Sequence, residues 1–183
     1  IIGDSFADDP VNSWAFGSQA GIANFYKMTA KKRYLNTGFG HVMNDGSGGA
    51  LWLPPGEKKN IPLWRSFDIA VSMIRNGGLG SIPRGIQFDN ILASKKPIEP
   101  HYYLFALAAR SGFQGKGIGS KLLKAGLEKA DREGMPTYLE SSKEANVPFY
   151  RRFGFQLIER IDPGKDFPPL WLMWRGVNST LKD

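Results

Sequence analysis

The sequence contains no cysteine, and only two of its 183 residues are histidines, His41 and His101. A chain without cysteine cannot form disulfides, attack a substrate with a thiolate or bind a metal through sulfur. Two imidazoles are also too few for a histidine-rich metal centre, so we expect no metal site. These absences exclude thiolate catalysis and cysteine-ligated metals, and they disfavour a histidine-rich metal site.

The sequence also lacks any apolar run of about 18 residues, the length that a membrane-spanning helix needs. Residues 1–9 carry neither the basic region nor the apolar stretch of a secretory signal. We therefore expect a cytoplasmic protein with no membrane partner. With 42% hydrophobic and 22% charged residues, the chain is expected to fold as a single domain over residues 1–183.

The net charge of +7 admits two interpretations. A mildly basic surface is common in folded proteins and needs no partner. Alternatively, Lys116, Lys121 and Lys124 gather near a glycine-rich segment, where they favour a polyanionic ligand. The basic residues form no long run and are interspersed with acids, which argues against nucleic-acid binding.

The segment Gln114–Gly119 is the most informative part of the chain. It follows an apolar run at residues 102–109 and leads into a helical pattern at residues 120–133, as a turn between a strand and a helix would. Glycines let backbone N–H groups turn toward a ligand, and a helix N-terminus adds partial positive charge, so this arrangement suits a phosphate. Its spacing fits neither a Walker loop nor the dinucleotide-binding fingerprint, which disfavours a nucleotide-phosphate enzyme.

Two sequence motifs occur in the second half of the chain. Gln114, Gly117 and Gly119 satisfy Q/R-x-x-G-x-G/A, and residues 146–155 read N-x-x-F-Y-x-x-x-G-F. With both motifs in this order, residues 101–175 resemble the acetyl-CoA-binding core of the GCN5-related N-acetyltransferase (GNAT) family. The resemblance implies direct transfer of an acetyl group from acetyl-CoA to an amine, without an acyl-enzyme. A non-catalytic acyl-CoA-binding or regulatory module is the alternative.

The resemblance places acetyl-CoA along the glycine turn and the strand before it. Backbone N–H groups of the turn are expected to bind the pyrophosphate, and an N–H near the end of the strand is expected to face the thioester carbonyl. Asn146 either contacts coenzyme A or only caps the short helix that follows it. The implied cofactor-binding residues are Leu107, Ala108, Ala109, Gln114, Gly115, Lys116, Gly117, Ile118, Gly119, Ser120 and Asn146.

Two side chains are the candidates for proton transfer. The family places a tyrosine near the departing sulfur, and Tyr150 matches that position; a phenol is protonated at neutral pH and can return a proton to the thiolate. Alternatively, Tyr150 only packs beside Phe149 and Phe153. Glu140 is expected to accept the proton of the amine, directly or through water, or to be an ordinary surface or salt-bridged residue.

The resemblance implies an α/β fold with a mixed, mostly antiparallel sheet, a splayed pair of parallel central strands and helices on both faces. The strand that begins the fold of this family is absent from the sequence. Apolar periodicity predicts helices at 19–36, 63–75, 84–94 and 117–133 and a short helix after Asn146, and strands at 38–44, 49–53, 102–109, 137–141, 155–160 and 170–175.

The sequence does not reveal the acceptor amine. Its pocket is expected to draw on residues 8–30 and 52–95, together with Tyr138 and Glu140. Aromatic side chains of these segments either line the pocket or, as is commoner for aromatic residues, belong to the core. They are Trp14, Phe25, Trp52 and Phe88.

Overall fold

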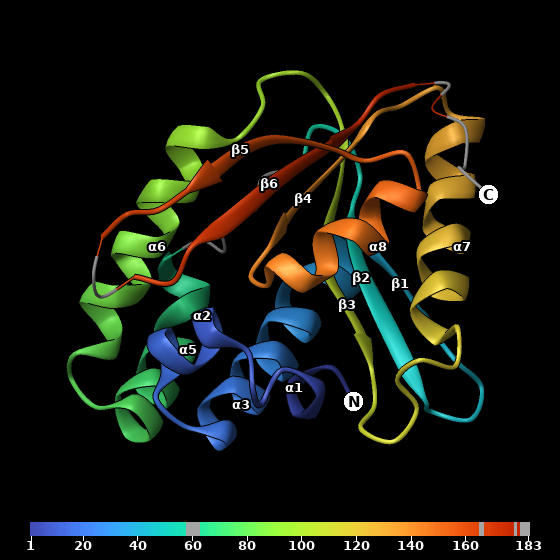
Figure 1. Ribbon diagram of the computed structural model, residues 1–183. Helices are drawn as coiled ribbons and strands as arrows, with labels where there is room; N and C mark the ends of the chain where they lie inside the picture. The colour runs from blue at the N-terminus through green and yellow to red at the C-terminus, as the bar shows by residue number, and fades with distance from the viewer. Residues whose placement is uncertain (58–62, 165–166, 178, 180–183) are drawn as a thin grey trace.

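Figure 1 shows the computed structural model, which describes residues 1–57, 63–164, 167–177 and 179. One six-stranded sheet runs through the molecule, and helices cover both of its faces. The mixed α/β architecture that the sequence predicts is confirmed.

The sheet consists of β1 (Phe39–Val42), β2 (Gly48–Leu53), β3 (Tyr102–Ala109), β4 (Thr137–Ser141), β5 (Gln156–Ile161) and β6 (Leu170–Arg175). Their order across the sheet is β1-β2-β3-β4-β6-β5. Only β3 and β4 are parallel, and they pair over three residues each, Tyr102–Leu104 against Thr137–Leu139. Beyond these residues the two strands diverge and leave a gap at the centre of the sheet (Figure 1).

The helices follow the sequence predictions except near the N-terminus and at the start of the helix predicted at 84–94. They are α1 (Ile2–Ser5), α2 (Pro10–Phe16), α3 (Gln19–Thr29), a π-helical turn (Ala30–Tyr34) that joins α3 to α4 (Leu35–Thr37), α5 (Leu63–Gly77), α6 (Ser81–Lys95), α7 (Ile118–Arg132) and α8 (Val147–Arg152). In the described part of the chain, no helix has the length and apolar character needed to cross a membrane.

Two helices differ from the sequence predictions because a proline lies in their first turn. Helix α2 was not predicted, because the pair Asp9-Pro10 that begins it can equally mark the end of a helix. In the structure Asp9 caps α2, and its carboxylate accepts a hydrogen bond from the Asn12 N–H at 2.9 Å. Helix α6 begins at Ser81, three residues before the predicted start, with Pro83 in its first turn. Proline fits there because first-turn N–H groups have no intrahelical acceptor.

Each face of the sheet has its own apolar core. On the α7 face, helices α7 and α8 cover strand side chains that include Trp52, Tyr102 and Leu139. On the α3 face, helices α1, α2, α3 and α6 cover strand side chains that include Tyr103 and Tyr138. Neighbouring strand residues alternate between the faces, so Tyr102 and Tyr103 belong to different cores.

A bulge at Phe105 interrupts this alternation in β3. One step along β2, from Leu51 to Trp52, corresponds to two steps along β3, from Ala106 to Leu104. Phe105 is therefore the extra residue, and both it and its successor pack against the core of the α3 face. The bulge thereby decides which residues at the end of β3 point toward α7.

The antiparallel neighbours β2 and β3 are joined by the 48 residues 54–101. A hairpin loop usually contains only about two to five residues. Here the connection contains α5 and α6, which pack against α3 and α2. The long connection therefore adds a helical layer to the α3 face.

Candidate functional site

The glycine turn ends at the N-terminus of α7. Gly117 immediately precedes this helix, and both it and Gly115 have positive φ angles, 77° and 74°. No side chain caps the helix, and its first turn closes with a bond from the Lys121 N–H to the Gly117 carbonyl. The N–H groups of residues 118–120 therefore have no intrahelical acceptor. Free donors at the positive end of a helix dipole favour a phosphate.

A pocket of about 330 Å³ opens beside this helix end. Its walls are the end of β3, the glycine turn with the start of α7, and α8. The lining residues are Leu107, Ala109, Phe113, Gln114, Gly115, Gly117, Ile118, Gly119, Ser120, Asn146, Phe149, Tyr150 and Arg152. The fold thus brings together most of the residues that the two sequence motifs select.

The end of β3 directs backbone groups toward this pocket. In an antiparallel pair, opposed residues alternate between hydrogen-bonded and non-hydrogen-bonded pairs. The Arg110 N–H donates to the Ser47 carbonyl at 2.8 Å, so in the same register Ala108 is also bonded to β2. Leu107 and Ala109 then belong to non-bonded pairs. Their N–H and C=O groups point away from β2, toward the gap that β4 leaves.

Two of the predicted cofactor-binding residues do not line the pocket. Ala108 is buried within the sheet. Lys116 is exposed on the glycine turn, where its Nζ lies 5.0 Å from the centre of the Phe113 ring. A flexible lysine on an exposed turn can still reach a bound anion, whereas the Ala108 side chain cannot turn out of the sheet.

Asn146 lines the pocket, and its side chain makes no capping hydrogen bond with α8. A helical turn at Glu144–Asn146 precedes α8, so the Asn146 backbone is already helical, with φ −85° and ψ −16°. A capping side chain requires an extended backbone instead. The expected cap is therefore not formed, and the Asn146 amide is left beside the pocket.

Three further lining residues are absent from the sequence predictions: Phe113, Phe149 and Arg152. Phe149 lies within the second motif, directly before Tyr150, so the motif itself carried the signal. The Arg152 guanidinium lies 5.7 Å from the centre of the Phe149 ring and adds positive charge to the pocket wall. No pattern in the sequence distinguishes Arg152 from the other exposed basic residues.

Tyr150 reaches the pocket from α8. Its side chain is buried, and the ring centres of Phe149 and Phe155 lie 5.1 and 5.8 Å from its own. Burial raises the pKa of the Tyr150 hydroxyl above its ordinary value, because the phenolate would lose its hydration. Tyr150 therefore stays protonated at neutral pH and is available as a proton donor.

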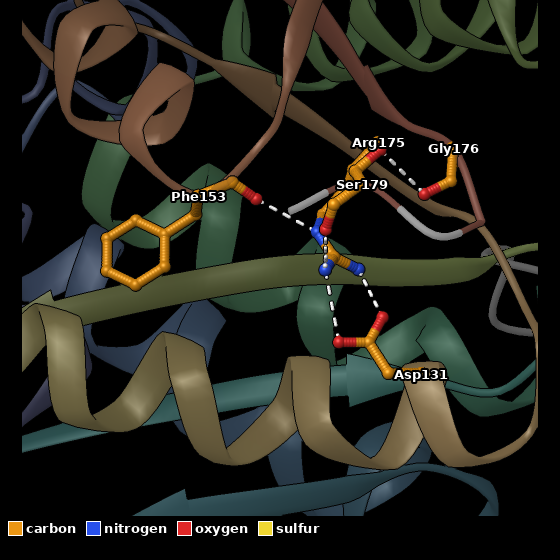
Figure 2. A network of polar contacts seen from close by, with 5 residues as sticks. All are labelled: Asp131, Phe153, Arg175, Gly176 and Ser179. Carbon is orange, nitrogen blue, oxygen red and sulfur yellow. Dashed lines mark hydrogen bonds and ion pairs between the residues drawn. The ribbon is translucent and has the colours of Figure 1, made fainter. Parts of the chain in front are cut away.

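A buried arginine holds the C-terminal end of α8 against α7 (Figure 2). Arg175, at the end of β6, is only 2% exposed and bonds both carboxylate oxygens of Asp131, at 2.5 and 3.0 Å. Its Nε donates to the Phe153 carbonyl and its Nη2 to the Ser179 carbonyl, each at 2.9 Å. Because Asp131 belongs to α7 and Phe153 follows α8, the guanidinium joins the two helices that form walls of the pocket.

Glu140 lies on the α3 face, outside this pocket. It follows the last β4 residue that pairs with β3, where the two strands diverge. Its carboxylate accepts a hydrogen bond from the Tyr103 hydroxyl at 2.5 Å. Burial, and secondarily the charge of Glu140, raises the pKa values of Tyr103 and Tyr138. The two candidate proton-transfer residues, Tyr150 and Glu140, therefore lie on opposite sides of the splayed sheet.

The aromatic side chains considered for the acceptor pocket are packed against other rings. Trp52 is fully buried on the α7 face, so the core interpretation is confirmed for this residue. Phe25 stacks within the aromatic cluster of the α3 face. Trp14 and Phe88 both pack against Phe167, with ring centres 4.7 and 5.9 Å away.

The splayed sheet and the pocket between β3, α7 and α8 define an acetyltransferase-type fold, and comparisons with known sequences agree. The profile of the Acetyltransferase (GNAT) family matches residues 86–155. An uncharacterized N-acetyltransferase from Schizosaccharomyces pombe is 30% identical in an alignment that covers 83% of this chain. The chain belongs to the GNAT family. It spans 66% of the length of the Schizosaccharomyces pombe relative.

Solved structures share the fold. A Corynebacterium glutamicum protein, described as histone acetyltransferase HPA2 and related acetyltransferase, has a TM-score of 0.69 at 23% identity over 97% of this chain and 87% of that chain. Arylalkylamine N-acetyltransferase 2 from Aedes aegypti has a TM-score of 0.61 at 18% identity over 97% and 91% of the two chains. At these identities the likeness concerns the fold alone.

Proposed function

We propose that this chain transfers the acetyl group of acetyl-CoA directly to an amine. The observation that carries the proposal is the pocket in which the start of α7, the end of β3 and Tyr150 meet. Acetyl transfer requires a protein to hold the pyrophosphate of the coenzyme, to stabilise an oxyanion and to move protons. Each task has a matching group in this pocket, except for removal of the amine proton, which we assign to Glu140 on the opposite face of the sheet.

The coenzyme lies with its pyrophosphate at the glycine turn and its thioester at the end of β3. The free N–H groups of residues 118–120 and the helix dipole bind the phosphates. The pantetheine arm follows the edge of β3 that β4 leaves unpaired. The N–H of Leu107 or Ala109 then donates to the thioester oxygen, since both groups point into the gap.

The transfer proceeds by attack of the neutral amine nitrogen on the thioester carbonyl carbon. A C–N bond forms, the carbonyl oxygen becomes an oxyanion stabilised by the β3 N–H, and the C–S bond then breaks. The Tyr150 hydroxyl gives its proton to the departing thiolate, which leaves as coenzyme A thiol. The amine nitrogen loses a proton to Glu140, directly or through water. The products are an N-acetyl amine and coenzyme A.

The position of Glu140 supports a role on the acceptor side. The residue stands where β3 and β4 diverge, on the face opposite α7, so an amine that enters from the α3 face meets it first. A carboxylate there also attracts the protonated form of an amine before transfer. The acceptor is therefore expected to approach from the α3 face, while the coenzyme lies along the α7 face.

Ligand binding distinguishes this proposal from a nucleotide-phosphate enzyme. Thermal-shift measurements with acetyl-CoA, ATP and NAD should show a rise in the melting temperature with acetyl-CoA and little change with the other two. Stabilisation by ATP or NAD alone would contradict the assignment of the pocket.

Turnover distinguishes an enzyme from a non-catalytic acyl-CoA-binding module. A free-thiol assay over small amines, aminonucleosides, polyamines and peptides should show coenzyme A release that depends on the amine. A chain that binds acetyl-CoA but releases no thiol with any of these amines would be a binding module instead.

A further inference from the structure

A buried carboxylate links the helices of the α3 face to the end of β4. Asp9, the capping residue of α2, is 1% exposed. Its Oδ1 accepts hydrogen bonds from the backbone N–H and the side-chain amide of Asn12, both at 2.9 Å. Its Oδ2 accepts a hydrogen bond from the Ser142 hydroxyl. Capping α2 occupies only Oδ1, so the bond to Ser142 is a separate connection.

Ser142 stands between two functional segments. It follows β4, which carries Glu140, and precedes the helical turn and α8, which carry Asn146 and Tyr150. The segment is stiffened locally, because the hydroxyl of Ser141 donates to the Lys143 carbonyl at 2.9 Å. A constraint on Ser142 is therefore transmitted to the start of α8 rather than absorbed by a loose loop.

The same polar network extends in the other direction, toward β3. The Asn12 side-chain oxygen accepts a hydrogen bond from the Tyr26 hydroxyl at 3.3 Å. The Tyr26 ring packs against Phe105, the bulge residue of β3, with ring centres 5.6 Å apart. The chain of contacts from Ser142 through Asp9, Asn12 and Tyr26 thus spans the gap between β4 and β3, which no longer pair at this level.

We propose that Ser142 is a positioning residue for acetyl transfer, which holds Tyr150 at the correct distance from the backbone of Leu107 and Ala109 through its bond to Asp9. The inference rests on the proposed function. One end of the network fixes the segment that leads into α8, and the other end fixes the bulge that aims the end of β3. The α3-face helices therefore brace the gap in which the thioester carbon, the oxyanion donor and the proton donor must meet.

A Ser142→Ala variant tests this role, because it removes the buried bond to Asp9 and leaves in place both the Asp9 cap of α2 and the more exposed ion pair between Lys143 and Asp8. Ser142→Thr keeps a hydroxyl and serves as the conservative rescue. Ser5→Ala is the matched control: Ser5 is also a half-buried serine, it belongs to α1, and its hydroxyl donates to the Ile1 carbonyl at 2.9 Å. The control thus removes a serine hydrogen bond of the same layer that does not reach β4.

With acetyl-CoA and an amine that the parent enzyme acetylates, Ser142→Ala should lower kcat about 10- to 100-fold, as a displacement on the order of 1 Å does. The dissociation constant for coenzyme A should change by less than about twofold, since the pyrophosphate turn on α7 is untouched. Ser142→Thr should recover most of the parental kcat, and Ser5→Ala should retain it. Rates are compared in single-turnover experiments, so that product release does not hide the chemical step.

Amide hydrogen exchange provides a measurement that needs no substrate. Ser142→Ala should speed exchange in α8 and in residues 105–109, and Ser5→Ala should not. An active parent whose Ser142→Ala variant keeps its single-turnover rate and its exchange pattern would overturn this inference alone. A parent that acetylates no amine would instead overturn the proposed function, and the positioning role with it.

Discussion

Gly117 is favoured by its own backbone conformation, and the proposed coenzyme would add a second requirement for glycine. Its φ angle is 77°, a region that glycine adopts without strain, and apart from its chain neighbours no atom of the described residues would lie within 4 Å of a Cβ built on it. The space around Gly117 is therefore open. A side chain would enter the volume where the phosphates of the coenzyme are proposed to approach the helix end.

We expect Gly117→Val to weaken coenzyme A binding more than tenfold, which corresponds to more than about 1.4 kcal/mol. Gly134→Val is the matched control, because Gly134 also has a positive φ angle, 60°, and an open surrounding, but lies beyond the other end of α7. Both variants bear the backbone strain, and only one affects the pocket. Calorimetric titration with coenzyme A measures this difference. If Gly117→Val and Gly134→Val both fold and bind coenzyme A as tightly as the parent, the assignment of the glycine turn to the pyrophosphate is wrong.

Tyr150 offers a test in which packing and chemistry separate. Tyr150→Phe keeps the ring and its contacts with Phe149 and Phe155 but removes the proton. If the hydroxyl protonates the thiolate, kcat should fall about 100- to 10,000-fold with little change in coenzyme A affinity. Burial keeps the Tyr150 pKa high, so the parental kcat should show no loss from phenol ionisation below about pH 10.

The contrary result is equally clear for this tyrosine. If Tyr150→Phe turns over at the parental rate while the chemical step is rate-limiting, the hydroxyl has no role in proton transfer. The residue would then contribute only to the core of the α7 face.

His101 should make the protein less stable in mild acid. Burial lowers the pKa of this imidazole, an effect only partly opposed by its contact with the Glu99 carbonyl, 2.6 Å from Nδ1. The unfolded chain, with a histidine pKa near about 6.5, therefore binds the proton more readily than the folded chain. Neutral His101 makes its full contribution to the free energy of unfolding above about pH 6.5. This contribution is lost as the pH falls toward the lower pKa that His101 has in the folded chain.

Urea unfolding between pH 8 and pH 5 measures this effect, with pH values chosen to bracket about 6.5. The free energy of unfolding should fall less steeply in His101→Gln than in the parent. His41→Gln is a useful comparison, because burial also lowers the pKa of His41, which is more exposed. Parallel pH profiles for the parent and His101→Gln would show that His101 ionisation does not contribute.

At the scale of single residues, the sequence predicts those pocket residues whose type is fixed by a motif or by the backbone conformation. Gly117 stands out because its positive φ angle favours glycine, and Gly119 because its motif position is glycine or alanine. Tyr150 stands out by its spacing from Asn146. Arg152 does not, because a basic residue on a helix surface is ordinary until the fold places it beside a pocket.

Helix α7 packs so closely on the sheet that one of its residues must be glycine. A Cβ at Gly126 would lie 2.2 Å from the ring of Trp52, a fully buried side chain of β2 that cannot move aside. Replacing glycine by alanine inside a helix normally stabilises it by about 1 kcal/mol. Here the sign should be reversed, because overpacking a core costs about 1 to 3 kcal/mol.

We therefore expect Gly126→Ala to lower the free energy of unfolding, measured in urea. Gly85→Ala in α6 is the control: the added Cβ would meet only the terminal methyl group of Met73, at 2.9 Å, and that group can rotate away. The control should be neutral or stabilising. A Gly126→Ala variant as stable as the parent would show that α7 can shift away from the sheet without cost.

At the scale of elements, continuous apolar runs are predicted well and irregular backbone is not. The strands at 102–109 and 137–141 have the predicted bounds, since both are covered on two faces and leave a simple pattern. The bulge at Phe105 leaves no trace in composition, because it depends on how β2 pairs with β3. The π-helical turn at Ala30–Tyr34 is equally invisible, since its residues also suit an α-helix.

At the scale of the whole molecule, contacts between residues far apart in sequence fix the geometry of the site. Ser142 and Asp9 are separated by 133 residues, and Arg175 and Asp131 by 44. Both contacts constrain α8, one through its leading segment and one through its C-terminal end. The resemblance to a family predicts that α8 lies beside the coenzyme, but side-chain contacts of this kind become visible only once the fold is known.

The long connection between β2 and β3 also has a consequence for how the chain folds. Closing a loop of 48 residues costs about 2 kcal/mol more in chain entropy than closing a turn of about four residues. The pairing of β2 with β3 therefore cannot start the sheet as a fast local hairpin. Docking of α5 and α6 on α2 and α3 shortens the effective loop, so these helices assist the closure. The helical layer of this connection thus acts on the folding rate as well as on the shape of the α3 face.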